Sequence, residues 1–410
     1  MADAERKTTF REVFRLAEFR AVWVADLLSV AGDQVTRVAL AVLVYAKTGS
    51  AALTALTYAL TFLPALAGPL LGGFADRYSR RNVMIVTNSA RAVLVAVMAI
   101  PDLPLPALYA LLIVVQLMAA PHDAARGALL ADILDGDRLV VGNSARNVTN
   151  QLAQMAGFAF GGGLAALINP HVALLVDAAS FTLAALLVAV GVRSRPAAAT
   201  AGSDGPSLWQ STRQGLRLVA GDGRLRVLAV LAWMIGLSVV PEGLAVPYAA
   251  EIGASPAAVG LLLAADPLGM AIGAFVLGRF VRPERRVRLM GPLAAAAGIP
   301  LLVCATKPDL ILSMALFALC GACAAYLVVV GAVWARIVPD RMLGQAMSLY
   351  LSGILASQGI AIALTGLLAA RIGSADTIAV TGVVCLVIGL GAALAWRRND
   401  SPAKSPNEAA

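Results

Sequence analysis

Long apolar stretches recur along this chain, and they limit what it can fold into more than any other feature. Each holds roughly 17 to 25 residues, enough for a helix to cross a hydrocarbon layer of about 30 Å at 1.5 Å per residue. Short charged breaks separate about twelve of them. They run approximately over residues 21–46, 52–74, 83–100, 106–121, 141–168, 172–192, 227–249, 257–277, 289–305, 310–334, 343–370 and 377–396.

The composition excludes the soluble multidomain class that 410 residues would otherwise suggest. Hydrophobic residues make up 60% of the chain, charged residues only 14%, and the mean hydropathy is +0.81. So much apolar surface needs a lipid bilayer around it. We therefore expect an all-α integral membrane protein with about twelve transmembrane helices.

The net charge of +8 could indicate a nucleic-acid partner. The placement of the 32 basic residues decides between that partner and a membrane topology. Lys47, Lys307 and Arg371 lie in one set of loops, Arg37, Arg91 and Arg146 fall within predicted spans, and all the others lie on the opposite side. This asymmetry is typical of cytoplasmic loops. It predicts a multi-pass protein of the cell (cytoplasmic) membrane with both termini in the cytoplasm, and no nucleic-acid partner.

Polar interruptions divide the chain into five parts. We expect a cytoplasmic amphipathic segment at 1–20, a six-helix bundle at 21–192, a cytoplasmic linker with an amphipathic helix at 193–226, a second bundle at 227–396 and a disordered cytoplasmic tail at 397–410. A solvated tail is the alternative for the first segment. A weak repeat at an offset of 202 residues aligns Gly142 with Gly344 and Gly157 with Gly359. Duplicated halves predict a pseudo-twofold axis and a solute site near mid-depth.

The sharpest motif is Gly72-Gly73-Phe74-Ala75-Asp76-Arg77-Tyr78-Ser79-Arg80-Arg81, between the second and third predicted spans. It resembles the signature G-x-x-x-D-R-x-x-R-R of the major facilitator superfamily, whose span number and halves cover essentially the whole chain. The resemblance implies the major facilitator fold, a monomer, and a cytoplasmic gate formed by Gly72, Asp76, Arg77, Arg80 and Arg81. Gly72 would allow close helix approach, and Asp76 would accept from the N-terminus of span eleven. The alternative is that the arginines only set topology.

Shorter strings resemble the branch of this superfamily that contains macrolide and catecholate-siderophore exporters. They are Gly32-Asp33 with Arg37, Leu43-Val44-Tyr45 with Thr48-Gly49-Ser50, and Val338-Pro339-Asp340-Arg341 with Gly344. A glycine run in span five, with Gly157, Gly161 and Gly162, resembles the stretch linked with antiporters, although Phe158 stands where proline is usual. The alternative for this run is helix packing through small residues, which we favour.

Six charged residues within predicted spans are the candidates for substrate contact or proton coupling: Asp33, Arg37, Arg91, Asp177, Glu242 and Asp266. A charge in the bilayer costs at least about 2.5 kcal/mol, so each must face protein or water. Asp33 and Arg37 are four residues apart and can pair, so Asp33 is either a coupling carboxylate or half of a structural ion pair.

The other four candidates divide into two pairs. Glu242 and Asp266 lie beside prolines, which suits proton or cation sites. For Asp177 and Arg91 an interhelical structural role is favoured.

These features predict a secondary transporter and no enzyme. The chain has no phosphate-binding loop, and Cys320 and Cys323 are assigned to packing, so no cofactor and no metal are expected. The leading hypothesis is efflux of an amphipathic small molecule (a drug, macrolide or siderophore) driven by the proton gradient through alternating access. A metabolite importer of the same fold and a membrane-embedded sensor without transport remain the alternatives.

Overall fold

The computed structural model describes residues 9–67, 78–195, 208–339 and 342–400, and over these residues every regular element is a helix. The described residues group into two compact units. Unit 1 draws on residues within 9–49, 60–195 and 255–264, and unit 2 on residues within 50–59, 208–254 and 265–400. Residues 50–59, in the second predicted span, therefore group with the helices of the second half of the chain. Residues 255–264, at the start of the eighth span, group with the helices of the first half.

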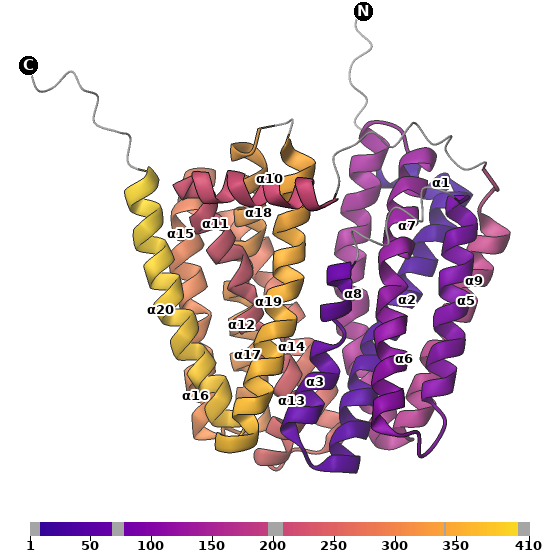
Figure 1. Ribbon diagram of the computed structural model, residues 1–410, viewed down its shortest axis with the longest axis horizontal. Helices are drawn as coiled ribbons and strands as arrows, with labels where there is room; N and C mark the ends of the chain where they lie inside the picture. The colour runs from indigo at the N-terminus through magenta and orange to yellow at the C-terminus, as the bar shows by residue number, and fades with distance from the viewer. Residues whose placement is uncertain (1–8, 68–77, 196–207, 340–341, 401–410) are drawn as a thin grey trace, which may run out of the picture. The chain divides into compact units, whose positions relative to one another are not determined.

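Unit 1 is built around α2, which packs against α8 and α9, while α5 packs against α9 and α7 (Figure 1). Its helices are α1 (Phe10–Arg15), α2 (Ala17–Thr48), the 3-10 turn η1 (Leu63–Ala67), α5 (Arg80–Met98), α6 (Leu105–Leu117), α7 (Ala119–Ile133), α8 (Asp137–Leu167) and α9 (Pro170–Gly191). The first turns of α14 (Pro256–Phe280) complete this unit.

Unit 2 holds α3 (Ala51–Ala59), which packs against α13 and α19, and the helices of the second half of the chain. These are α10 (Leu208–Gly221), α11 (Gly223–Trp233), α12 (Ile235–Ser238), α13 (Val240–Glu251), the rest of α14, α15 (Pro283–Ala296), α16 (Gly298–Val303), the 3-10 turn η2 (Cys304–Thr306), α17 (Leu310–Ala324), α18 (Tyr326–Ile337), α19 (Leu343–Ile372) and α20 (Ser374–Asp400). Figure 1 shows α10 running across the ends of the long helices, in contact with α11 and α19.

Within the described ranges, nine helical stretches are long and apolar enough to cross a membrane. They are Ala17–Thr48, Leu105–Ile133, Pro170–Gly191, Gly223–Glu251, Pro256–Phe280, Pro283–Thr306, Leu310–Ile337, Leu343–Ile372 and Ser374–Asn399. Two other helices of similar length, α5 and α8, are more polar and fall outside this group. Every predicted span thus has a helix at its position, with residues 68–74 of the second span lying outside the described residues.

Several helix ends differ from the predicted ends. The fourth span was expected to stop at Pro121, but α7 continues to Ile133. Pro121 lies in the first turn of α7, where its missing N–H costs little, so the proline does not end the helix. The last helix also runs to Asp400, four residues into the expected tail.

Small residues bring the helix backbones into contact in both units. In unit 1, a Cβ on Gly157 would meet the carbonyl oxygen of Ala31 at 2.4 Å, so α8 and α2 touch there. In unit 2, a Cβ on Gly269 would meet the carbonyl oxygen of Ala318 at 1.8 Å, which places α14 against α17. Such contacts are typical of helices in lipid, where the hydrophobic effect does not drive helices together and van der Waals contact between close backbones does.

Candidate functional site

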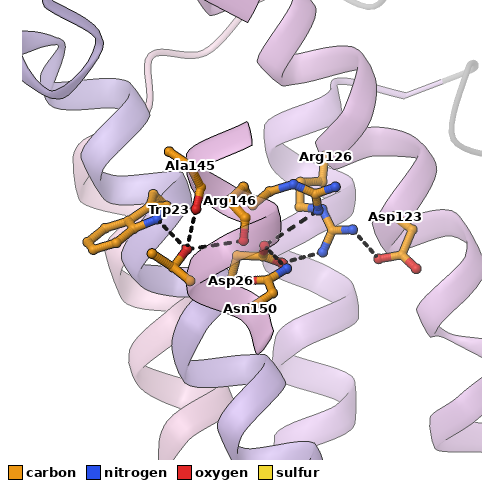
Figure 2. Close-up of polar contacts among 8 residues, drawn as sticks. Trp23, Asp26, Asp123, Arg126, Ala145, Arg146 and Asn150 are labelled. Atoms are coloured by element: carbon orange, nitrogen blue, oxygen red, sulfur yellow. Dashed lines mark hydrogen bonds and ion pairs between the residues drawn. The ribbon is translucent and has the colours of Figure 1, made fainter. Parts of the chain in front are cut away.

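A buried carboxylate on α2, Asp26, gathers the densest group of charges in the described part of unit 1. Its side chain is only 1% exposed. Arg126 of α7 donates to Oδ1, Arg146 of α8 places Nη1 3.5 Å from Oδ2, and Asn150 of α8 donates to Oδ2 at 3.1 Å. Figure 2 shows these side chains converging from three helices. We call Asp26, Arg126, Arg146 and Asn150 the Asp26 cluster.

Neighbouring contacts hold the Asp26 cluster in place. Arg126 also pairs with Asp123 on its own helix, at 3.0 Å, so that the guanidinium lies between two carboxylates (Figure 2). Trp23, one turn before Asp26, donates its indole N–H to Thr149 of α8 at 3.0 Å. Because Asp26 of α2 binds side chains of both α7 and α8, the cluster fastens these three helices together.

Asp26 is not among the candidates predicted from the sequence. Asp26 lies seven residues before Asp33, which places both carboxylates on one face of α2, and this spacing was the available signal. Its partner Arg126 lies beyond the predicted end of span four at Pro121, so no sequence signal paired it with a residue inside a span. The extension of α7 to Ile133 brings Arg126 into the helix.

A second group of charges lies deeper along α2, where Asp33 pairs with Arg91 of α5 at 2.7 Å. The Arg91 side chain is 4% exposed, and its guanidinium lies 4.2 Å from the ring centroid of Phe181 on α9. Asp33 retains 25% exposure. The partner that the structure gives Asp33 thus comes from another helix, while Arg37, four residues along, lies over the ring of Phe62 at 4.9 Å.

Asp177 of α9 lies beside this pair, fully buried against α2. Thr36 donates to its Oδ2 at 2.5 Å and Ser180 to its Oδ1 at 3.0 Å. A Cβ on Gly32, the residue before Asp33, would meet Oδ1 of Asp177 at 2.0 Å, so only glycine fits there. Within the described ranges no basic side chain forms an ion pair with Asp177. This second group, Asp33, Arg91 and Asp177, is here named the Asp33 group.

The two acidic candidates of unit 2 have different surroundings. Glu242 on α13 accepts a hydrogen bond from the hydroxyl of Tyr58 on α3 at 2.5 Å. Asp266 on α14 is partly buried, and a Cβ on Gly321 of α17 would meet its Oδ1 at 2.9 Å. These contacts place both carboxylates within the packed helices of unit 2, on different helices.

Only part of the motif between spans two and three can be placed. Gly72, Asp76 and Arg77 lie outside the described residues, so their expected gating role stays a prediction. Arg80 pairs with Asp132 of α7 and donates to the carbonyl of Ala128, and Arg81 donates to the carbonyl of Ala189 on α9 at 2.5 Å. These arginines fix the start of α5 to two neighbouring helices.

The glycine run of α8 lies in close contact with other backbones at three positions. A Cβ would come within 2.4 Å of the backbone of Ala31 at Gly157, 2.9 Å of Val35 at Gly161 and 2.5 Å of Gly260 at Gly162. At Gly163 a Cβ would meet nothing within 4 Å. These distances fit the packing interpretation of the run.

Comparison with known proteins agrees with this architecture. The family described as Major Facilitator Superfamily matches residues 22–246 and 242–410. Macrolide efflux protein A of Streptococcus pyogenes is 22% identical over 385 residues, which cover 90% of this chain and 94% of that protein. The enterobactin exporter EntS of Shigella boydii is 25% identical over 380 residues, covering 91% and 90%. The predicted resemblance to macrolide and siderophore exporters is thereby confirmed.

Solved structures show the same fold at lower sequence similarity. A bacterial homolog of the human lysosomal transporter Spinster, in an inward-facing and occupied conformation, has a TM-score of 0.73 and 15% identity, and the match covers 93% of this chain and 96% of that one. The nucleoside transporter NupG has a TM-score of 0.74 and 12% identity, with coverage of 93% and 100%. Since the family match extends over nearly all of the sequence, this chain belongs to the Major Facilitator Superfamily and is a multi-pass membrane transporter.

Proposed function

We propose that this transporter exports an amphipathic small molecule (a drug, macrolide or siderophore) from the cytoplasm in exchange for protons, by alternating access. Relatives that span nearly the whole chain are named for macrolide efflux and enterobactin export, which supports the direction and the solute class. In this proposal the protein is a monomer in the cytoplasmic membrane with both termini inside, as the placement of its arginines favours.

The observation that carries the proton coupling is the composition of the Asp33 group. Two carboxylates, Asp33 and Asp177, accompany one guanidinium, Arg91, whose ion pair goes to Asp33. A buried charge without a counter-charge is costly, so Asp177, whose side-chain partners among the described residues are hydroxyl groups, is suited to bind a proton. Coupling by a carboxylate requires this ability to take up and release a proton.

Asp33 is the member of the group that retains access to the surroundings. Its side chain is 25% exposed, whereas Asp177 is fully buried. A proton that binds Asp33 would free Arg91 from its ion pair and change the charge beside Asp177. We therefore assign Asp33 to proton entry and Asp177 to proton storage during the transport cycle.

The test is accumulation of dye, macrolide and catecholate-siderophore panels in pump-deficient cells that express the protein. We expect lower accumulation than in empty-vector cells, and we expect both a protonophore and Asp33→Asn to abolish the difference. Asp376→Asn, which changes an exposed carboxylate in the first turn of α20, is the matched control and should export normally.

The other outcomes separate the alternatives. Higher accumulation in expressing cells would identify an importer. Export that persists with the protonophore and with Asp33→Asn would refute the proton coupling. Unchanged accumulation across the whole panel would contradict export of these compounds and favour a sensor.

A further inference from the structure

The inner part of α8 is unusually polar for a helix of a membrane transporter. Four of its five amide side chains, all but Gln151, recur at intervals of four, three and four residues: Asn143, Asn147, Asn150 and Gln154. This spacing places them on one face of the helix. We call Asn143, Asn147, Asn150 and Gln154 the amide face; it extends roughly 16 Å along α8 at 1.5 Å per residue.

Most of the amide face forms no side-chain hydrogen bond within the part of the chain that the structure describes. Asn150 donates to Asp26, at the edge of the Asp26 cluster. Asn143, Asn147 and Gln154 form no side-chain hydrogen bond with any described residue, and none of their polar atoms is among the buried ones that lack a partner. Their amide groups therefore reach an open surface, and Asn147 is the most exposed of the three.

The opposite side of the same helix is exposed in a different way. Val148 and Leu152 point away from the amide face and are 63% and 56% exposed. In a membrane protein such an apolar surface faces lipid. An amide without a partner costs about 4–8 kcal/mol in a hydrocarbon environment, so three of them in a row would not face lipid. The amide face therefore meets water or a bound solute.

The amide face ends where α8 meets the first turns of α14. Phe158, one turn beyond Gln154, is buried, and a Cβ on Gly260 of α14 would meet its carbonyl oxygen at 2.4 Å. The close contact of Gly162 with Gly260 follows. The polar surface is thus open along Asn143 to Gln154 and closed at its far end by packed backbone.

We propose that the amide face is a solute-contacting surface that recognises the hydroxyl-bearing part of the exported compound; this rests on the proposed export function. Carboxamides donate and accept hydrogen bonds and carry no charge, so they match hydroxyl and carbonyl groups. The charges beside Asn150, Asp26 with Arg126 and Arg146, are already paired with one another. A neutral surface of this kind selects compounds with sugar or catechol hydroxyl groups over cations that lack hydroxyl groups.

The first arm of the test measures hydration and does not depend on transport. Asn147→Cys and Gln154→Cys would be labelled with a membrane-impermeant charged maleimide in inside-out vesicles, with Leu152→Cys as the lipid-facing control. The native chain serves as background, because three of its cysteines are buried and Cys323 is partly buried. We expect both positions to react markedly faster than position 152, because the reacting thiolate forms only where water has access. Equal rates would overturn the inference, whatever the protein transports.

The second arm measures contact with solute. Erythromycin, a sugar-bearing macrolide, and a catecholate siderophore are the hydroxyl-bearing probes, and tetraphenylphosphonium is a cation without hydroxyl groups. We expect a hydroxyl-bearing probe to slow labelling at 147 and 154 several-fold, and tetraphenylphosphonium to have no effect. Protection by tetraphenylphosphonium alone, or by none of the three, would contradict the proposed recognition.

The third arm connects the surface with export. Asn147→Leu and Gln154→Leu should raise the KM for export of the protecting probe about tenfold, which corresponds to about 1.4 kcal/mol, while Leu152→Ala leaves it unchanged. Unaltered export by both amide variants would refute the solute contact and leave the proposed function standing. Absence of export by the wild type would refute the proposed function, with the labelling arms still deciding on the amide face.

Discussion

The Asp26 cluster and the Asp33 group both lie on one face of α2, yet they balance their charges differently. The cluster surrounds one deeply buried carboxylate with two guanidiniums and an amide. The Asp33 group has two carboxylates and one guanidinium, and Asp177 depends on hydroxyl donors. A carboxylate held by two guanidiniums resists protonation, whereas one whose described partners are hydroxyl groups can take up a proton. We therefore assign stability to the first and transport to the second.

The largest expected effect is on stability, from Asp26→Ala. The substitution leaves two largely buried guanidiniums without their shared carboxylate, and breaking a buried pair in this way costs about 3–5 kcal/mol. Thermal unfolding of the purified protein in detergent should show a strongly lowered midpoint. Asp123→Ala, which removes the exposed carboxylate from the same Arg126, is the control and should change the midpoint little. Equal effects of both substitutions would contradict the stabilising role that we assign to the buried carboxylate of Asp26.

Asp177→Asn should act on transport and spare the fold. The amide oxygen can still accept from Thr36 and Ser180, but the side chain can no longer take up a proton. We expect proton-driven export to fall about a hundredfold, since proton transfer by a positioned group typically contributes 10²-fold or more. Initial rates in vesicles with an imposed pH gradient measure this. A variant that unfolds like Asp26→Ala but exports normally would reverse the assignment.

The packing that supports both groups can be probed through the glycines of α8. Gly157→Ala places a Cβ 2.4 Å from a carbonyl of α2, and overpacking of this kind costs about 1–3 kcal/mol. Gly163→Ala is the matched control, because a Cβ there meets nothing within 4 Å. The unfolding midpoint of Gly157→Ala should be lower than that of Gly163→Ala. Identical midpoints would show that α2 and α8 separate easily.

The smallest expected effect comes from Asp132→Asn, which breaks the ion pair with Arg80. Both side chains are about one third exposed, so solvent screens the pair. Such pairs contribute about 0–1 kcal/mol. The unfolding midpoint should move only slightly and should become independent of the substitution in high salt. A loss as large as that of Asp26→Ala would show that exposure does not separate the two classes of ion pair.

Some features of the fold were predictable because they depend on short stretches of sequence. Hydropathy located a helix at every predicted span, and the amphipathic pattern of the linker located α10, which begins at Leu208. Helix ends were less predictable. Pro121 signals a break only if it lies in a helix interior, and its place in the first turn of α7 depends on where Ala119 begins that helix.

The charges of the candidate site were predictable one by one but not as pairs. Asp33 and Arg37 satisfy a local rule, four residues apart on one helix. The ion pair of Asp33 is instead formed with Arg91, which lies 58 residues away. Similarly, Arg126 reaches Asp26 across 100 residues. No local spacing predicts such contacts.

The sequence by itself determined that this chain crosses a membrane many times and belongs to a superfamily of transporters, because burial of apolar stretches in lipid and short motifs are local properties of the chain. Only the tertiary structure decided which carboxylate meets which guanidinium, and which polar face of α8 stays open. The physical reason is that these contacts depend on the rotation and depth of helices α2, α5, α7, α8 and α9 against one another. That arrangement is set by small residues such as Gly32 and Gly157, where backbones touch.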